Sequence, residues 1–122
     1  GARAAVYYEQ FCQDNDDIEF HPESVALMRY HDLDDTVGKE AIQMHFGTEE
    51  SRVQSLYDIF KDADALDRWR LGGRGLDPKY LRTDKAKILT DYSHRIVKET
   101  IPGELLDKID NTVREMMEQH EK

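Results

Sequence analysis

Apolar residues recur along the chain at spacings of three and four, which places side chains on one face of an α-helix. The first such run ends in a polar turn at residues 14–17. The second begins at Pro22, a residue suited to the first turn of a helix. A third run starts from Thr48 as its cap and continues to Leu71, where Gly72 must end it. These runs predict three helices.

Two further runs complete the pattern. One covers residues 84–99. The other follows Pro102 and carries apolar residues at spacings of 3, 4 and 3, which predicts a helix that buries a seam (Leu106, Ile109, Val113, Met116). Residues 33–48 are ambiguous, because Gly38 favours a loop whereas residues 39–46 could hold a short helix. No segment alternates with period two long enough to be a strand. We therefore expect an all-α domain of five or six helices with no sheet.

Composition and charge narrow the classes of function. The chain has 122 residues, which suits one domain, and no apolar run approaches the roughly 18 residues of a membrane span. Its 17 basic and 26 acidic residues give a net charge of −9, which opposes non-specific binding to nucleic acid or to anionic membranes. The single cysteine, Cys12, cannot form an internal disulfide and lies on an apolar face. We expect a small core residue there and a cytoplasmic protein.

Two short strings carry most of the candidate chemistry. In residues 61–70, Asp64 and Arg68 share a helix face, and one interpretation is a solvated helix with ion pairs worth about 0.3–0.5 kcal/mol each. However, alanines flank Asp64 on both sides, which leaves its helix face open and suits a carboxylate that points into a cleft. We expect Asp62 and Asp67 to be local ion-pair or capping partners instead.

The second string, residues 30–35, contains His31 and Asp32. Imidazole and carboxylate groups are good ligands for Mn, Fe, Zn or Mg in mixed nitrogen and oxygen sites. A histidine in this position also often caps the C-terminal end of a helix. Both interpretations stay open on the string alone.

Together the strings resemble the HD-domain superfamily of metal-dependent phosphohydrolases. The stronger match is residues 61–70, and it places the family's last metal-ligand aspartate at Asp64. Residues 1–5 also resemble a stretch that follows a histidine in that family. The resemblance covers roughly residues 1–82. It implies an HD-like helical bundle fragment at residues 1–100, followed at residues 101–122 by a C-terminal helix that packs or binds a partner.

The family signature, a His, then His-Asp, then a distant Asp, allows two alignments. In the first, His31 and Asp32 are the His-Asp pair, and only His21 can supply the preceding histidine. In the second, the pair precedes Gly1, and His31 matches a later histidine that binds a second metal or the substrate phosphate. We favour the second alignment, because it also explains why the chain begins inside a core-facing helix. We therefore expect upstream residues to be missing.

The resemblance implies a divalent metal (Mn, Fe, Mg or Zn) in the intact parent, where Asp64 and His31 would be ligands. His31 would alternatively be a phosphate-facing acid, and Asp32 would orient it. The following basic residues would face the phosphate (Arg68, Arg70, Arg74). Some HD-like phosphodiesterases use histidine as acid and base without metal, which would relax the requirement for Asp64. With so few ligands, we expect weak or no metal binding by this chain alone.

The substrate would be a phosphorylated small molecule or another phosphoester. The alternative function is a non-catalytic helical interaction module, whose C-terminal seam binds a partner helix and whose acidic surface selects a basic partner. In either case we expect the apolar face of the first helix, including Tyr8 and Phe11, to be covered by the missing N-terminal part or by a second copy of the chain.

Overall fold

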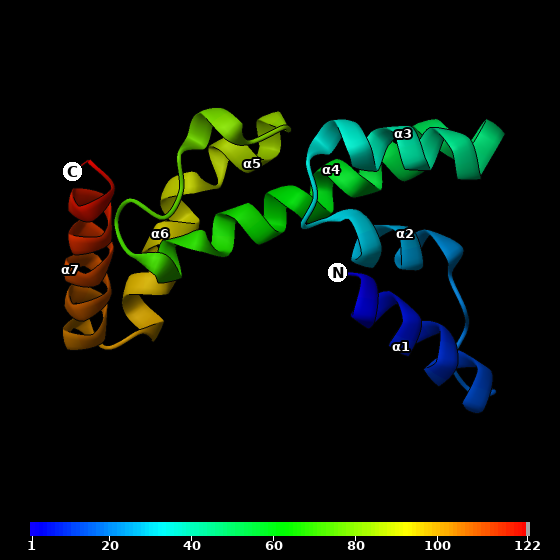
Figure 1. Ribbon diagram of the computed structural model, residues 1–122, viewed down its shortest axis with the longest axis horizontal. Helices are drawn as coiled ribbons and strands as arrows, with labels where there is room; N and C mark the ends of the chain where they lie inside the picture. Colours follow the sequence, from blue (N-terminus) through cyan, green and yellow to red (C-terminus); the bar gives the residue numbers. More distant parts are fainter. Residues whose placement is uncertain (122) are drawn as a thin grey trace. The chain divides into compact units, whose positions relative to one another are not determined.

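The computed structural model describes residues 1–121, and in that range the chain consists of helices and connecting turns with no strand (Figure 1). The all-α prediction is therefore confirmed. The α-helices are α1 (Ala2–Asp14), α2 (Pro22–Tyr30), α3 (Asp35–Phe46), α4 (Glu50–Leu66), α5 (Asp84–Ile88), α6 (Thr90–Thr100) and α7 (Gly103–His120). Three 3-10 turns join them, namely η1 (Gly47–Glu49), η2 (Asp67–Leu71) and η3 (Pro78–Tyr80).

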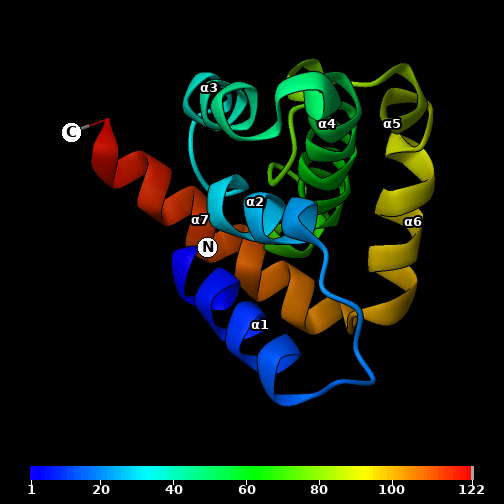
Figure 2. The ribbon, with the colours of Figure 1, turned by 90° about the vertical axis from the view of Figure 1, so that its right-hand side faces the viewer.

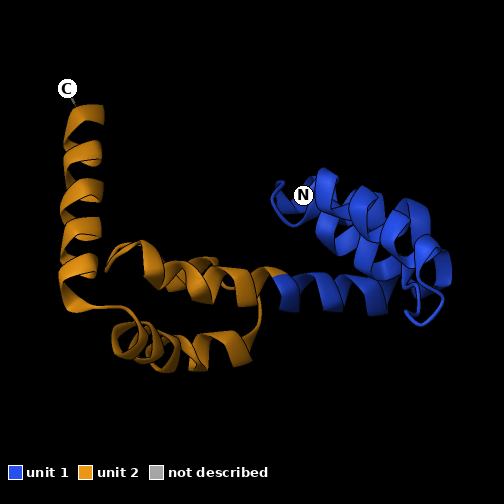
Figure 3. Cartoon of the chain, turned by 90° about the horizontal axis from the view of Figure 1, so that it is seen from below, with its two compact units in different colours: residues 1–60 blue, residues 61–122 orange. Residues whose placement is uncertain are grey.

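The chain forms two compact units, coloured separately in Figure 3, and each has its own core. The first unit is Gly1–Phe60 and the second begins at Lys61, inside α4. In the first unit, Ile42, Val53 and Tyr57 have no solvent exposure, and partly buried side chains surround them (Leu27, Tyr30, Phe46). Residues from α2, α3 and α4 thus close this core.

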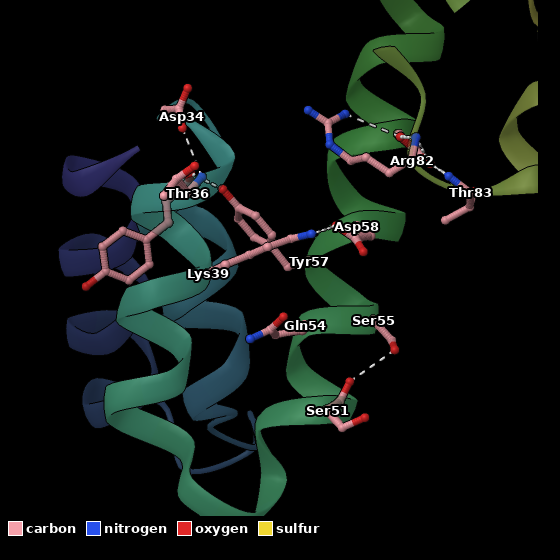
Figure 4. Close-up of polar contacts among 12 residues, drawn as sticks. Asp34, Thr36, Lys39, Ser51, Gln54, Ser55, Tyr57, Asp58, Arg82 and Thr83 are labelled. Atoms are coloured by element: carbon pink, nitrogen blue, oxygen red, sulfur yellow. Dashed lines mark hydrogen bonds and ion pairs between the residues drawn. The ribbon is translucent and has the colours of Figure 1, made fainter. Parts of the chain in front are cut away.

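Tyr57 explains the glycine in α3. Its hydroxyl donates to the Tyr30 carbonyl at 3.0 Å, and its ring passes so close to Gly38 that any side chain there would overlap the hydroxyl. Figure 4 shows this tyrosine extending from α4 toward α3. Gly38 is therefore required by packing inside a helix, although by sequence it favoured a loop.

Local signals account for most of the helix ends. Pro22 lies in the first turn of α2 as predicted, and the Asp34 side chain caps α3 by accepting from the Thr36 N–H at 2.9 Å. That cap starts α3 at Asp35, earlier than the short helix considered at 39–46. Thr48 lies in the turn η1, which directly precedes α4, so this helix begins two residues after the predicted cap.

In the second unit, the long run that the spacing predicted as far as Leu71 is α4 followed by η2. It ends at Gly72, whose φ of +108° favours glycine. The predicted helix at 84–99 is divided at Leu89, whose N–H bonds to the carbonyls of Lys85 and Ala86 (Figure 2). One predicted helix thus becomes α5 and α6.

The second unit is built around Trp69. Its core also contains Leu76, Leu81, Ala86 and Val97. The Trp69 indole N–H donates to the Ser93 hydroxyl at 3.1 Å, and its ring stacks on His94 at a centroid distance of 4.2 Å. These contacts fix η2 against α6.

Cys12 and the apolar seam of α7 were both predicted to pack, but their environments differ. Cys12 is buried, as expected for a small core residue. Helix α7 has no fully buried residue, and only Leu106 of its seam packs against the core of the second unit. Leu105, Met116 and Met117 are 46–58% exposed.

Within residues 1–121, no helix is both long and apolar enough to cross a membrane.

Glu23 links α2 to α4 in the first unit. The pKa of its carboxyl lies below the usual value because the side chain accepts a hydrogen bond from its own backbone amide. Partial burial opposes this effect, but Arg52 adds a hydrogen bond at 3.4 Å and its positive charge. The ionised form of Glu23 is therefore the one that the fold stabilises.

We expect Glu23→Gln to lower the free energy of unfolding at pH 7, by about 1 kcal/mol or less, and to have little effect at pH 3. The Glu23 carboxyl binds its proton more weakly in the folded chain than in the unfolded chain. The stabilisation is therefore complete above the ordinary pKa of 4.5 and is lost as the pH falls through the lower folded value. Urea unfolding at both pH values tests this, with the exposed Glu40→Gln as control. An equal loss at pH 3 and pH 7 would contradict it.

Candidate functional site

His31 lies directly after the last residue of α2 and caps that helix. Its Nδ1 is 2.8 Å from the Met28 carbonyl oxygen, and since a carbonyl can only accept, Nδ1 carries the proton. In the neutral ring the lone pair is then on Nε2. This is the tautomer found in metal-binding histidines, whose second nitrogen donates to a carbonyl or carboxylate.

The His31 ring is held in place by Phe60 as well as by Met28. The two rings meet edge to face at a centroid distance of 5.3 Å and an angle of 74°. The half-buried imidazole therefore has one nitrogen held by the backbone and an edge-to-face contact with an aromatic ring. Such a ring loses little orientational freedom when it binds a ligand.

Asp32, predicted to orient His31, has a different partner. Its carboxylate is exposed and pairs with the amino group of Gly1 at 3.4 Å. The orientation of His31 comes from Met28 and Phe60.

On α4, Asp62 is the buried carboxylate and Asp64 is exposed. Asp62 accepts from the Arg82 N–H at 2.9 Å, and from the Thr83 N–H and hydroxyl, both at 2.8 Å. The Arg82 guanidinium lies 3.3 Å away. Figure 4 shows Arg82 and Thr83 turned toward α4. The predicted local role of Asp62 was therefore wrong, because its partners lie 20 and 21 residues away.

The same network begins α5. Thr83 caps this helix by accepting from the Ala86 N–H, while its own hydroxyl donates to Asp62. Asp62 thus connects α4 to the start of α5 within the second unit. The Thr83-Asp84 pair is typical of a helix start, but no local pattern pairs it with Asp62.

The three arginines predicted to face phosphate have different local environments. The Arg68 Nε donates to the Gly75 carbonyl at 2.8 Å, and the Arg70 Nε donates to Asp67 at 2.7 Å, which confirms Asp67 as a local ion-pair partner. Arg74 is exposed and borders a hollow of about 380 Å³ together with Asp110 and Arg114. Arg74 therefore has the least constrained guanidinium.

His31 belongs to the first unit and Asp64 to the second. The prediction that they share a cleft stays a prediction. Among residues 1–121, no three His, Cys, Asp or Glu side chains gather as a metal site would require. Imidazole nitrogen and carboxylate oxygen are atom types that bind divalent ions. That His31 and Asp64 act together as ligands stays a prediction.

Comparison with known proteins gives no further assignment. No protein-family model matches the chain, and neither the curated proteins nor the solved structures contain a significant match. The fold and the site define an all-α protein. Its candidate groups are His31, whose Nε2 carries a lone pair in the neutral ring, and the exposed carboxylate of Asp64 on α4.

Proposed function

We propose that the chain is part of an HD-type phosphohydrolase that cleaves a phosphoester. The observation that carries the proposal is the hydrogen bond from His31 Nδ1 to the Met28 carbonyl. In the neutral ring it leaves Nε2 unprotonated, with a lone pair that can bind a metal ion or a proton. A histidine in this state can bind a metal ion or accept a proton from water. The resemblance of residues 61–70 to the family supports the same reaction class.

In this proposal Asp64 and His31 are ligands of a divalent metal ion. When bound, such an ion polarises the phosphoryl group and lowers the pKa of the attacking water. The carboxylate of Asp64 is exposed, whereas that of Asp62, two residues earlier, accepts hydrogen bonds from Arg82 and Thr83. Asp62 thus acts as a positioning residue that fixes this part of α4.

The basic residues after Asp64 bind the phosphate. Arg74 can offer two parallel N–H groups to phosphate oxygens, the geometry in which arginine binds phosphate most tightly. Arg68 keeps its terminal nitrogens available while its Nε is held by Gly75. The substrate is a phosphorylated small molecule, and the guanidinium groups neutralise its charge.

The test has two readouts. First, hydrolysis of p-nitrophenyl phosphate and its diester by the intact parent protein is followed with Mn²⁺, and we expect Asp64→Asn and His31→Ala each to reduce turnover at least about 100-fold. Second, Mn²⁺ is titrated into the isotopically labelled chain, and we expect NMR signals of both residues to broaden at the same metal concentrations. The second readout does not require a complete active site.

Asp67→Asn is the matched control, because Asp67 lies on the adjoining turn and forms an ion pair with Arg70. It should leave both readouts unchanged. If His31→Ala stops turnover while Asp64→Asn does not, the metal-independent form of the reaction applies. If turnover is unchanged in both variants, or if Mn²⁺ broadens neither residue and no phosphoester is cleaved, the proposal is wrong.

A second candidate function, a non-catalytic interaction module, is supported by α7. Its exposed leucine and methionines could receive a partner helix. However, the acidic surplus is not where this alternative needs it. Residues 1–60 carry 4 basic and 13 acidic side chains, a net −9, whereas residues 61–122 carry 13 of each. The unit that contains α7 therefore does not select a basic partner by net charge.

A further inference from the structure

An apolar hollow lies on the surface of the first unit, bordered by α1 and α2. Its volume is about 550 Å³, and its lining is Arg3, Ala4, Tyr7, Tyr8, Phe11 and Met28. Tyr7 and Phe11 are 71% and 40% exposed, and their rings stack at a centroid distance of 6.2 Å. Val6, next to them on α1, is 59% exposed. Exposed aromatic residues gathered in this way are typical of protein-binding surfaces.

The hollow belongs to the strongly acidic half of the chain. The whole net charge of −9 is carried by residues 1–60, which form the first unit. Three aspartates, Asp14, Asp16 and Asp17, follow Phe11 at the end of α1, while Arg3 lies at the opposite end of the hollow. Approach of a positively charged partner is therefore favoured, above all at the Phe11 end.

We propose that this face binds a basic amphipathic helix of a partner protein. The lining residues extend over about 12 Å of α1, from Arg3 to Phe11, at 1.5 Å per residue. Two turns of a partner helix cover that length, with apolar side chains at spacings of three and four against Tyr7, Phe11 and Met28. Lysines or arginines at one end of the partner then face Asp14, Asp16 and Asp17.

Charge decides among the other occupants. A second copy would bring another first unit of net charge −9 to the same face, which opposes a symmetric dimer. Anionic lipid and nucleic acid are repelled for the same reason. The flexible Met28 side chain and the flat aromatic rings can pack against apolar side chains of different shapes on the partner helix. The proposal is independent of the phosphohydrolase function, because it uses neither His31 nor Asp64.

The probe is a helical peptide of about 14 residues made of leucine and lysine at amphipathic spacing, with a fluorescent label for anisotropy. Its counterpart replaces every lysine by glutamate. We expect the basic peptide to bind and the acidic one not to bind. In the double variant Tyr7→Ser, Phe11→Ser the affinity for the basic peptide should fall at least about tenfold. Raising the salt from 50 to 300 mM should weaken binding several-fold.

Met44→Ser is the matched control, since Met44 lies in the same unit, on α3, and is 83% exposed. Its affinity should stay within about twofold of the original chain. Equal binding of the acidic peptide, an unchanged affinity in the double variant, or an equal loss in Met44→Ser would overturn the proposal. Sedimentation that shows dimers of the original chain and monomers of the double variant would also overturn it, because the occupant would then be a second copy. Circular dichroism confirms that each variant is folded.

Discussion

Gly38→Ala should destabilise the first unit by about 2 kcal/mol. A methyl group at this position would overlap the hydroxyl of Tyr57, a side chain with no solvent exposure. Tyr57 cannot move away without losing its hydrogen bond to the Tyr30 carbonyl and its packing on Ile42 and Val53. Overpacking of this kind costs about 1–3 kcal/mol or more. That cost exceeds the gain of up to about 1 kcal/mol that alanine brings inside a helix.

Hydrogen exchange in the first unit measures this effect most directly, because Ile42 and Val53 belong to that core. Gly103→Ala is the control, since a methyl group there meets nothing within 4 Å. Tyr57→Phe alone should cost about 1 kcal/mol for the lost hydrogen bond. Combined with Gly38→Ala it should cost less than the sum of the single changes, because the overlap with the hydroxyl is gone and only that with the ring carbon Cζ remains. Faster exchange in Gly103→Ala than in Gly38→Ala would contradict the packing argument.

Asp62→Ala should have a comparable effect on the second unit, a loss of about 3 kcal/mol. The carboxylate is 2% exposed and serves the backbone N–H groups of Arg82 and Thr83, the Thr83 hydroxyl and the Arg82 guanidinium. Its removal leaves two buried backbone N–H groups and the Thr83 hydroxyl without this acceptor, and such groups cost more than a lost hydrogen bond between exposed groups. The start of α5 should also loosen, because Thr83 would lose the partner that fixes its cap.

Fluorescence of the single tryptophan reports this change, because Trp69 is part of the core of the second unit. We expect the urea midpoint to fall in Asp62→Ala and, by a smaller amount, in Asp62→Asn, which retains one acceptor oxygen. Asp64→Ala is the matched control, two residues further along α4 and exposed, and should change the free energy of unfolding by no more than about 0.5 kcal/mol. A larger loss in Asp64→Ala than in Asp62→Ala would reverse the roles given to the two aspartates.

These two aspartates show where sequence reasoning was sufficient and where it was not. The helical spacing from Val53 onward predicted α4, because burial of one face recurs every three to four residues. The flanking alanines singled out Asp64 as open, which agrees with its exposure. The same pattern could not identify Asp62 as buried, because its partners come from residues 82 and 83. Hydrogen bonds between distant segments leave no periodicity in either segment.

His31 gives a second example. Its place after an apolar run indicated either a ligand or a helix cap, and both interpretations depended on residues already visible in the string. The structure adds the Met28 carbonyl, which fixes the tautomer, and Phe60, which covers the ring. The contact with Phe60 joins residues 29 positions apart, so no local pattern could have predicted it.

By itself, the sequence determined the all-α fold, the start of α2 at Pro22 and the end of η2 at Gly72, because apolar spacing and the backbone preferences of proline and glycine act locally. Tertiary structure alone decided that Gly38 lies inside a helix and that Asp62 is the buried carboxylate. It also decided that Tyr7 and Phe11 of α1 are exposed. The physical reason is the same in each case. A helix propensity is a sum over neighbours in the chain, whereas burial and hydrogen-bond satisfaction depend on segments that only the folded chain brings together.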